Sequence, residues 1–157
     1  MRIVAFDPGA VTGFCEALVS SDGTIQVVKS QEIAWANRFS GVHGLLRGIE
    51  LGTRTLDPDR TFAPLPDVIV VEAFHLYAHR AKEQIGNDFP SVKMMGVIET
   101  YAFELGILDK IIYQPASVMS RVTILTEHVP SIARSEHARD AYRHLRYYVV
   151  MHPDKFM

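Results

Sequence analysis

The chain has 157 residues, 48% of them hydrophobic and 22% charged, and its 16 Lys and Arg against 18 Asp and Glu give a net charge of −2 at pH 7. The length predicts a single domain over residues 1–157 that buries its own core, and the composition excludes disordered, collagen-like and disulfide-stapled proteins. A chain of this charge has no overall attraction for nucleic acid, so a nucleic-acid function requires a local basic surface.

Three apolar runs separated by turn signals open the chain. The first turn begins at Asp7-Pro8-Gly9 and is closed by Thr12-Gly13, and the second is Ser21-Asp22-Gly23. Consecutive strands joined by such short connections form an antiparallel meander. The predicted strands are residues 2–6, 14–19 and 24–33.

The rest of the chain alternates helical and strand patterns. The run Val68-Ile69-Val70-Val71 is typical of a central strand covered on both faces, and a shorter strand is predicted at residues 110–114. Helices are predicted at residues 38–56, 91–105, 116–126 and from the N-cap candidate Ser135 to about Met151. The expected fold class is α/β, with a mixed five-stranded sheet, made of the three-strand meander plus two parallel strands, flanked by helices.

Cysteine usage and hydropathy indicate where the protein works. Cys15 is the only cysteine, which excludes an internal disulfide and a cysteine-rich zinc site and fits a reducing cytoplasm. No signal peptide is recognisable, and no run approaches the roughly 18 apolar residues of a membrane span. We therefore expect a cytoplasmic protein with no membrane contact.

Three carboxylates and a histidine are the candidate catalytic groups. Asp7 and Glu72 follow buried strands, and sites in open α/β sheets gather outside the carboxyl ends of the strands. Asp140 lies early in the final predicted helix, and His137 shares its helix face three residues earlier. If these side chains meet, the carboxylates repel one another unless a cation lies between them. Their oxygen ligands favour Mg²⁺ or Mn²⁺. Two ions roughly 3.5–4 Å apart activate water and stabilise the leaving oxygen of a phosphodiester.

Each of these residues also has a purely structural interpretation. Asp7 before Pro-Gly is a common turn former, and Asp140 alone is better explained as an exposed helix acid that pairs with Arg143 or Arg139. His137 alone is more often a surface residue than a catalyst. Glu72 is harder to explain in this way, because a carboxylate after an apolar strand is costly to bury unpaired.

Three segments carry a resemblance to a known family: Asp7-Pro8-Gly9 with Thr12-Gly13, Val70-Val71-Glu72, and His137-Ala138-Arg139-Asp140-Ala141. Together they resemble the RuvC-type Holliday-junction resolvases of the RNase H-like superfamily, and the order of predicted elements is similar over nearly the whole chain. The loop at Asp7 also resembles that of actin-like and sugar kinases, but those need two such domains and a much longer chain. The discriminating part is the late H-x-x-D-A segment.

The resemblance implies a Mg²⁺-dependent (or Mn²⁺-dependent) endodeoxyribonuclease that cuts branched DNA in recombination and repair. Asp7, Glu72 and Asp140 would be metal ligands, and His137 an extra ligand or a water-orienting residue. One departure is that the family has a Lys soon after the Pro that ends its fifth strand, whereas here Arg121 is the first cation after Pro115. The compact chain suits a phage-encoded or a stand-alone bacterial enzyme.

Two segments are candidates for contact with DNA. The stretch after Glu72 interleaves aromatic and basic residues, which suits unpaired bases stacking on rings while cations hold phosphates. The final helix belongs to the basic end of the chain, which has a net charge of +2 over residues 134–157. We expect its basic face, including Arg146 and His144, to line a track for DNA phosphates. Alternatively, Phe74 and Phe89 are core residues and the rest is solvated. The predicted nucleic-acid contacts are Phe74, His75, Tyr77, Arg80, Lys82, Lys93, Arg121, Arg139 and Arg143.

The predicted fold is compatible with two other functions, and the predicted substrate implies a homodimer. The fold also suits a nuclease acting on RNA or an RNA–DNA hybrid, or a non-catalytic nucleic-acid-binding module, although a binding module has no need for converging carboxylates. A junction has two strands to cut, so we expect a homodimer. The predicted interface is the helix at residues 91–105, which is apolar on two stripes that include Met94 and Met95.

Overall fold

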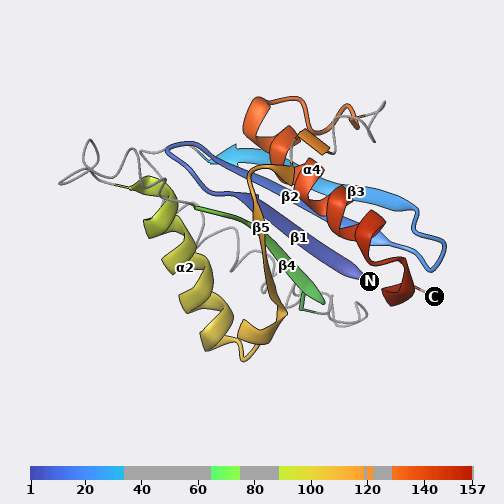
Figure 1. Cartoon of the computed structure of the whole chain (residues 1–157), viewed down its shortest axis with the longest axis horizontal. Coiled ribbons are helices and arrows are strands. Elements are labelled where there is room, and N and C mark those ends of the chain that lie inside the picture. Colours follow the sequence, from blue (N-terminus) through green and yellow to red (C-terminus); the bar gives the residue numbers. More distant parts are fainter. Residues whose placement is uncertain (34–64, 75–88, 119, 122–128, 157) are drawn as a thin grey trace, which may run out of the picture.

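A computed structural model describes residues 1–33, 65–74, 89–118, 120–121 and 129–156. It contains a five-stranded sheet with the strand order β3-β2-β1-β4-β5 (Figure 1). The strands β1, β2 and β3 pair antiparallel, and β4 and β5 run parallel to β1, which confirms the predicted mixed sheet. The strands are β1 (Arg2–Asp7), β2 (Thr12–Val19), β3 (Ile25–Ile33), β4 (Val68–Ala73) and β5 (Ile111–Pro115).

Two long helices cover opposite faces of this sheet. They are α2 (Pro90–Glu104) and α4 (Glu136–Met151), each within one residue of its predicted bounds, and short 3₁₀ turns η3 (Leu108–Lys110) and η4 (Pro153–Lys155) follow them. The helix predicted at residues 38–56 lies outside the described residues. Within the predicted helix at 116–126, the described residues Val118, Ser120 and Arg121 are helical. No helix in the described ranges is both long and apolar enough to cross a membrane.

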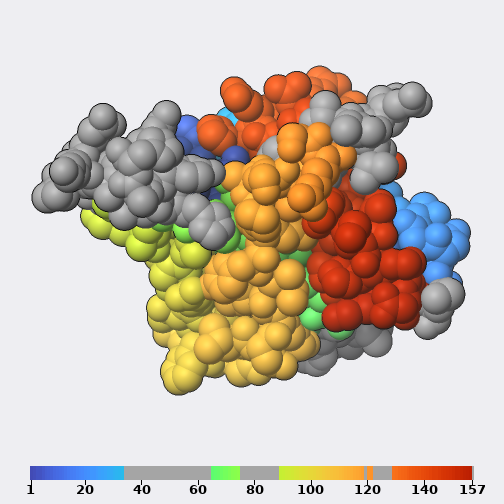
Figure 2. All heavy atoms as spheres, viewed as in Figure 1, coloured from blue at the N-terminus to red at the C-terminus, as the bar shows by residue number. Residues whose placement is uncertain are grey.

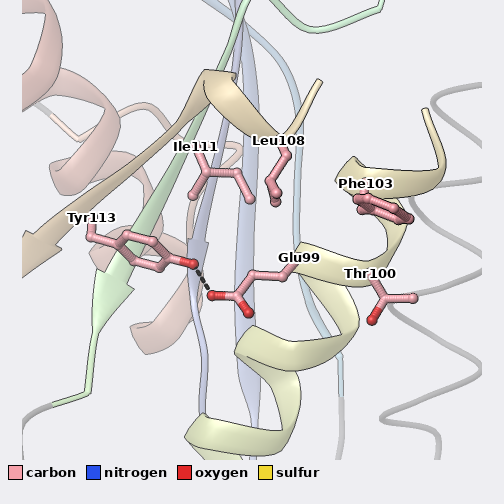
Figure 3. Close-up of a pocket in the computed structure, with 6 residues that line it drawn as sticks. All are labelled: Glu99, Thr100, Phe103, Leu108, Ile111 and Tyr113. Carbon is pink, nitrogen blue, oxygen red and sulfur yellow. Dashed lines mark hydrogen bonds between the residues drawn. The ribbon is translucent and has the colours of Figure 1, made fainter. Parts of the chain in front are cut away.

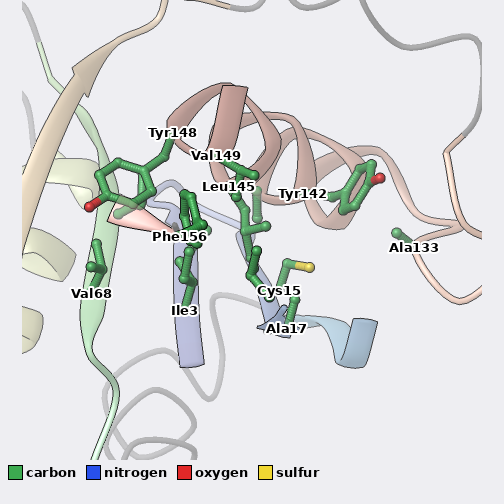
Figure 4. Packing of buried hydrophobic residues seen from close by; sticks show 14 residues of the cluster. Ile3, Cys15, Ala17, Val68, Ala133, Tyr142, Leu145, Tyr148, Val149 and Phe156 are labelled. Carbon is green, nitrogen blue, oxygen red and sulfur yellow. The ribbon is translucent and has the colours of Figure 1, made fainter. Parts of the chain in front are cut away.

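Alternation along the strands decides which side chains face which helix. Ile3 and Ala5 of β1 belong to the core under α4, whereas Val4 and Phe6 belong to the core under α2. Figure 4 shows Ile3 beneath Leu145, among the side chains of the α4 core. The two cores explain why β1 and β4 are unbroken apolar runs, because both faces of these strands are covered.

The strand β5 forms one edge of the sheet. In the space-filling view of Figure 2 it lies at the surface between α2 and α4, as expected for an edge strand with a helix on each side. Its side chains alternate in the same way, since Ile111 packs on the α2 core and Ile112 on the α4 core. Gln114, two residues after Ile112, therefore points to the α4 face.

The helix α4 lies unusually close to β2 because Gly13 has no side chain. A Cβ added to Gly13 would lie 1.9 Å from the carbonyl oxygen of His137, so only glycine allows this approach. Thr12 and Gly13 close the turn as predicted, since Gly13 pairs with Asp7, but they also belong to β2, which begins two residues earlier than predicted. The Thr12 hydroxyl still contacts the turn, because it donates a 3.3 Å hydrogen bond to the carbonyl of Gly9.

Candidate active site

Four residues on four strands form a row across the α4 face of the sheet. Asp7 pairs with Gly13 across β1 and β2, and Glu72 pairs with Gln114 across β4 and β5. Phe6 pairs with Val71, so one residue further along β1 and β4 the register brings Asp7 beside Glu72. Strand alternation puts all four on the side of the sheet that α4 covers. The predicted convergence of the two strand carboxylates is therefore built into the sheet register.

The first half of α4 presents a polar stripe to this row. His137, Asp140 and His144 are spaced i, i+3 and i+7, so they share one helix face. Small residues on the same helix, Ala138 and Ala141, are buried and let α4 lie close to the sheet. The stripe and the row together bring ionisable side chains from β1, β4 and α4 to one end of the sheet.

The first contact between helix and row joins His137 to Asp7. The His137 Nδ1 atom lies 2.8 Å from Oδ2 of Asp7, and the side chains are 39% and 13% exposed. The backbone N–H of His137 donates a 2.9 Å hydrogen bond to Oε1 of Glu32 on β3, which satisfies one of the free N–H groups at the start of α4. This end of the helix is thus fixed by β3 and by the close approach at Gly13.

The second contact joins His144 to Glu72 and Gln114. The Nε2 atom of His144 lies 2.8 Å from Oε2 of Glu72, and Nδ1 lies 2.8 Å from Oε1 of Gln114. The His144 side chain is 0% exposed, whereas that of Glu72 is 24% exposed. The prediction that His144 lines a surface phosphate track was wrong. His144 lies seven residues after His137 on the same face of α4, so its side chain faces the sheet and not the solvent.

The third carboxylate pairs within its own helix. An Nη1 atom of Arg143 donates a 2.7 Å hydrogen bond to Oδ1 of Asp140, as the structural interpretation of this residue predicted. Both side chains keep about a quarter of their surface exposed, at 27% for Arg143 and 25% for Asp140. The same Asp140 charge also acts on Asp7, so the ion pair and a place in the site are compatible.

The charges of Glu72 and Asp140 both act on Asp7. Burial, with the charges of Glu72 and Asp140, raises the pKa of Asp7 from its ordinary value of 3.8 to about 6, although the hydrogen bond and charge of His137 oppose the rise. Burial disfavours the charged form of His137, but its hydrogen bond to Asp7 and the charges of Asp7, Glu32 and Glu136 outweigh this and raise its pKa above 6.5. The ionised form of Asp7 is thus disfavoured mainly by burial and further by its two acidic neighbours.

The donor types suit a hard divalent cation, because Asp7, Glu72 and Asp140 bring carboxylate oxygens from β1, β4 and α4 to one end of the sheet. A cation there would offset the burial and the neighbouring negative charges that together raise the pKa of Asp7. Among the described residues, no group of three or more His, Cys, Asp or Glu is drawn together to hold a metal. Instead Asp7, Glu72 and Asp140 each contact a basic or histidine side chain. Cation binding would exchange some of these contacts for metal bonds.

The predicted nucleic-acid contacts are only partly within the described residues. Lys93, Arg121 and Arg139 are exposed, while Arg143 is held by Asp140. Phe74 is half-buried and its ring lies 5.3 Å from that of Phe89. The remaining four, His75, Tyr77, Arg80 and Lys82, lie outside the described residues. A role in DNA binding stays a prediction for all nine.

Sequence reasoning missed His144 and Gln114 as parts of this site. The available signal was the seven-residue spacing between His137 and His144, which puts both on one face of a helix that also carries Asp140. For Gln114 the signal was a polar side chain in a short apolar strand, which is costly to bury without a partner.

A pocket of about 530 Å³ lies on the opposite face of the sheet, between α2 and β5 (Figure 3). Glu99, Thr100 and Phe103 come from α2, and the hydroxyl of Tyr113 on β5 donates to the carboxylate of Glu99. Burial and this hydrogen bond raise the pKa of Tyr113. The pocket is separate from the carboxylate row, because Ile111 and Tyr113 face away from α4.

Comparison with known proteins shows the fold. No protein-family model matches the sequence, and no curated protein matches it. RuvC of Thermus thermophilus in complex with a Holliday junction substrate matches the structure with a TM-score of 0.66 and 15% identity, covering 99% of this chain and 97% of that one. A second structure of Thermus thermophilus RuvC matches with a TM-score of 0.62 and 16% identity, covering 96% of each chain. The chain therefore has the RuvC, RNase H-like fold, and neither match supports a phage origin.

Proposed function

We propose that the protein is a metal-dependent endonuclease that hydrolyses phosphodiester bonds in branched DNA, with four-way junctions as its substrate. The observation that carries the proposal is the placement of Asp7, Glu72 and Asp140, from β1, β4 and α4, at one end of the sheet. Burial, together with the charges of Glu72 and Asp140, raises the pKa of Asp7 there. The fold adds support, because it is that of a protein whose structure includes a bound Holliday junction. We also propose that residues 1–157 form a single nuclease domain with this fold.

In this proposal the three carboxylates hold Mg²⁺ or Mn²⁺. Such ions, when bound, would supply a water of lowered pKa and a positive charge that offsets the charge on the leaving oxygen. Asp7 and Glu72 supply oxygens from rigid neighbouring strands, and Asp140 supplies them from α4. His137, at the exposed start of α4, either adds a ligand or accepts the proton of the attacking water. Water adds to phosphorus as the bond to the leaving oxygen breaks.

A cleavage assay on matched substrates tests the proposal. Four-way junction, duplex, flap and RNA–DNA hybrid are incubated with the protein and Mg²⁺, with EDTA as the metal-free arm. We expect cuts in the junction, none with EDTA, and none from Glu72→Gln. Preference for the hybrid would make the protein an RNase H-like ribonuclease. Junction binding without cleavage in Mg²⁺ or Mn²⁺ would make it a binding module and overturn the proposal.

We propose further that two copies pair through the outer face of α2, so that a junction is cut on two strands. The predicted use of Met94 in this interface was wrong, because Met94 is 0% exposed and packs under the sheet. The solvent face instead carries Val92 at 48% and Phe103 at 72% exposure. Val92 and Phe103 share this face, and a contiguous exposed apolar patch is the feature that marks a contact surface.

A single charged substitution on the solvent face of α2 tests the proposed dimer. Phe103→Glu should give a monomer in sedimentation at micromolar concentration and leave single nicks in a junction. The control is Val150→Glu, which charges a 45% exposed apolar position on α4, on the other side of the sheet. A parent protein that sediments as a monomer while it cuts junctions on both strands would contradict the pairing.

A further inference from the structure

The polar contact furthest from solvent in the site is the chain Gln114–His144–Glu72. It runs from β5 through α4 to β4, with both hydrogen bonds 2.8 Å long. His144 is 0% exposed and Gln114 is 5% exposed, so neither is placed to touch a DNA substrate. Yet the chain ends on a carboxylate that is 24% exposed and lies beside Asp7.

Hydrogen-bond chemistry fixes the direction of this chain at its outer end. An ionised carboxylate only accepts, so Nε2 of His144 carries the proton and donates to Oε2 of Glu72. At the inner end, the amide of Gln114 presents either its oxygen or its NH₂ group, so it satisfies Nδ1 whether that atom donates or accepts. The ring is therefore held at both nitrogens, and rotation about its Cβ–Cγ bond would break both contacts.

The two hydrogen bonds of its ring nitrogens also exclude His144 as a metal ligand. A metal needs a free ring nitrogen with access to the ion, and both nitrogens of His144 are engaged within the core. His137 has the opposite character, since its ring is 39% exposed and contacts Asp7 through Nδ1. The two histidines of the α4 stripe thus have different tasks.

We infer that His144 is a positioning residue: together with Gln114 it locks one oxygen of Glu72 so that the exposed part of the carboxylate is presented to a divalent cation. The inference rests on the proposed function, because it assigns Glu72 a metal to bind. A flexible glutamate loses rotamer freedom when it binds an ion, and a carboxylate already fixed by a buried donor has less freedom to lose.

The first experiment measures Mn²⁺ affinity by the paramagnetic resonance signal of free Mn²⁺, with no DNA present. His144→Phe keeps a ring but removes both nitrogens, and we expect affinity to fall by about 10- to 100-fold. His144→Gln returns an N–H donor near the position of Nε2 and should recover most of the loss. Gln114→Leu should lower affinity in the same direction but less, because Nε2 remains.

A matched control separates positioning from stability. Val149→Ala opens a gap in the same core under the same helix but touches no carboxylate, so it should lower the melting temperature without changing Mn²⁺ affinity. If His144→Phe does not fold, Gln114→Leu carries the test. A folded His144→Phe or Gln114→Leu with the affinity of the parent, or a His144→Gln no better than His144→Phe, would overturn the inference.

The second experiment needs no metal. In the metal-free protein, ¹⁵N resonances of the imidazole should show a proton on Nε2 of His144. A bare Nε2 would overturn the positioning role whether or not the protein is a nuclease. Conversely, a protonated Nε2 in a parent that neither binds Mn²⁺ nor cuts DNA would confirm the contact but overturn the proposed function, and the role in metal binding with it.

Discussion

Two histidine–carboxylate pairs link α4 to the sheet, and they differ in which partner is buried. His137 is 39% exposed and contacts an Asp7 side chain that is 13% exposed. His144 is 0% exposed and contacts a Glu72 side chain that is 24% exposed. The hydrogen-bond lengths are equal at 2.8 Å, so distance alone does not distinguish the pairs. Burial does: the histidine at the start of α4 is free to change partners, whereas the one two turns later holds its partner still.

The largest expected effect comes from removing the carboxylate of the first pair. Asp7→Asn should reduce junction cleavage by about 1,000-fold or more, since several kcal/mol of metal stabilisation are lost. Glu72→Gln and Asp140→Asn should behave in the same way. DNA binding should be kept or strengthened, because a negative charge near phosphates is removed. Gel-shift and cleavage assays on the same junction check both parts, and full activity in any one variant would remove that residue from the site.

The next effect is expected where α4 meets β2. Gly13→Ala would put a Cβ 1.9 Å from the His137 carbonyl, so the start of α4 must move. We expect a cost of about 1–3 kcal/mol in unfolding free energy and loss of most cleavage, because both His137 and Asp140 are displaced. Mn²⁺ affinity should also fall. Chemical denaturation and cleavage rates check this.

Its control is Gly96→Ala on the exposed face of α2, where an added Cβ meets nothing within 4 Å. That variant should gain about 0.5–1 kcal/mol, because alanine costs less backbone entropy in a helix. Equal stability and activity in Gly13→Ala and the parent would show that α4 does not depend on this close approach.

Changing the exposed histidine should have a smaller effect on cleavage. His137→Ala should slow junction cutting by about 100-fold, as expected for loss of a group that handles a proton or a metal. His137→Asp should retain more activity, because a carboxylate also binds the metal. Cleavage should fall on the acidic side of the pH profile of the parent. An alanine variant as active as the parent would leave His137 with only its structural role.

The smallest effect concerns stability and follows from the pKa of Asp7. Its folded-state pKa of about 6 lies above the ordinary 3.8, so its contribution to stability is complete below about pH 3.8 and is lost as pH rises through about 6. The raised pKa of His137 also contributes stability that is lost as the pH rises. In EDTA at pH 8, the free energy of unfolding of Asp7→Asn should therefore be higher than that of the parent by on the order of 2 kcal/mol. Urea unfolding at pH 8 and pH 4 checks this, because the difference should disappear at the lower pH.

Much of the fold was predictable, because turn residues and apolar runs marked every described strand and both long helices. The approach of Asp7 to Glu72 was predictable for the same reason, since both lie at the carboxyl ends of neighbouring buried strands. The partner of His144 was not, because it depends on the register that sets Glu72 opposite Gln114. Nor was the inner face of α2, because the stripe with Met94 and the stripe with Met95 are both apolar. Local patterns do not decide which of two apolar stripes meets the sheet.

The bond between His137 and Asp7 joins residues that are 130 positions apart in the sequence. By contrast, the β1–β2–β3 meander forms from segments that follow one another directly, so it can assemble early. Closing the larger loop costs more chain entropy and awaits the docking of α4. A ribosome-bound chain that has folded only its first strands holds Asp7 but neither His137 nor Asp140. In the proposed function, the complete set of carboxylates therefore exists only when the helix at residues 136–151 has packed onto the sheet, so an incomplete chain would not cut DNA.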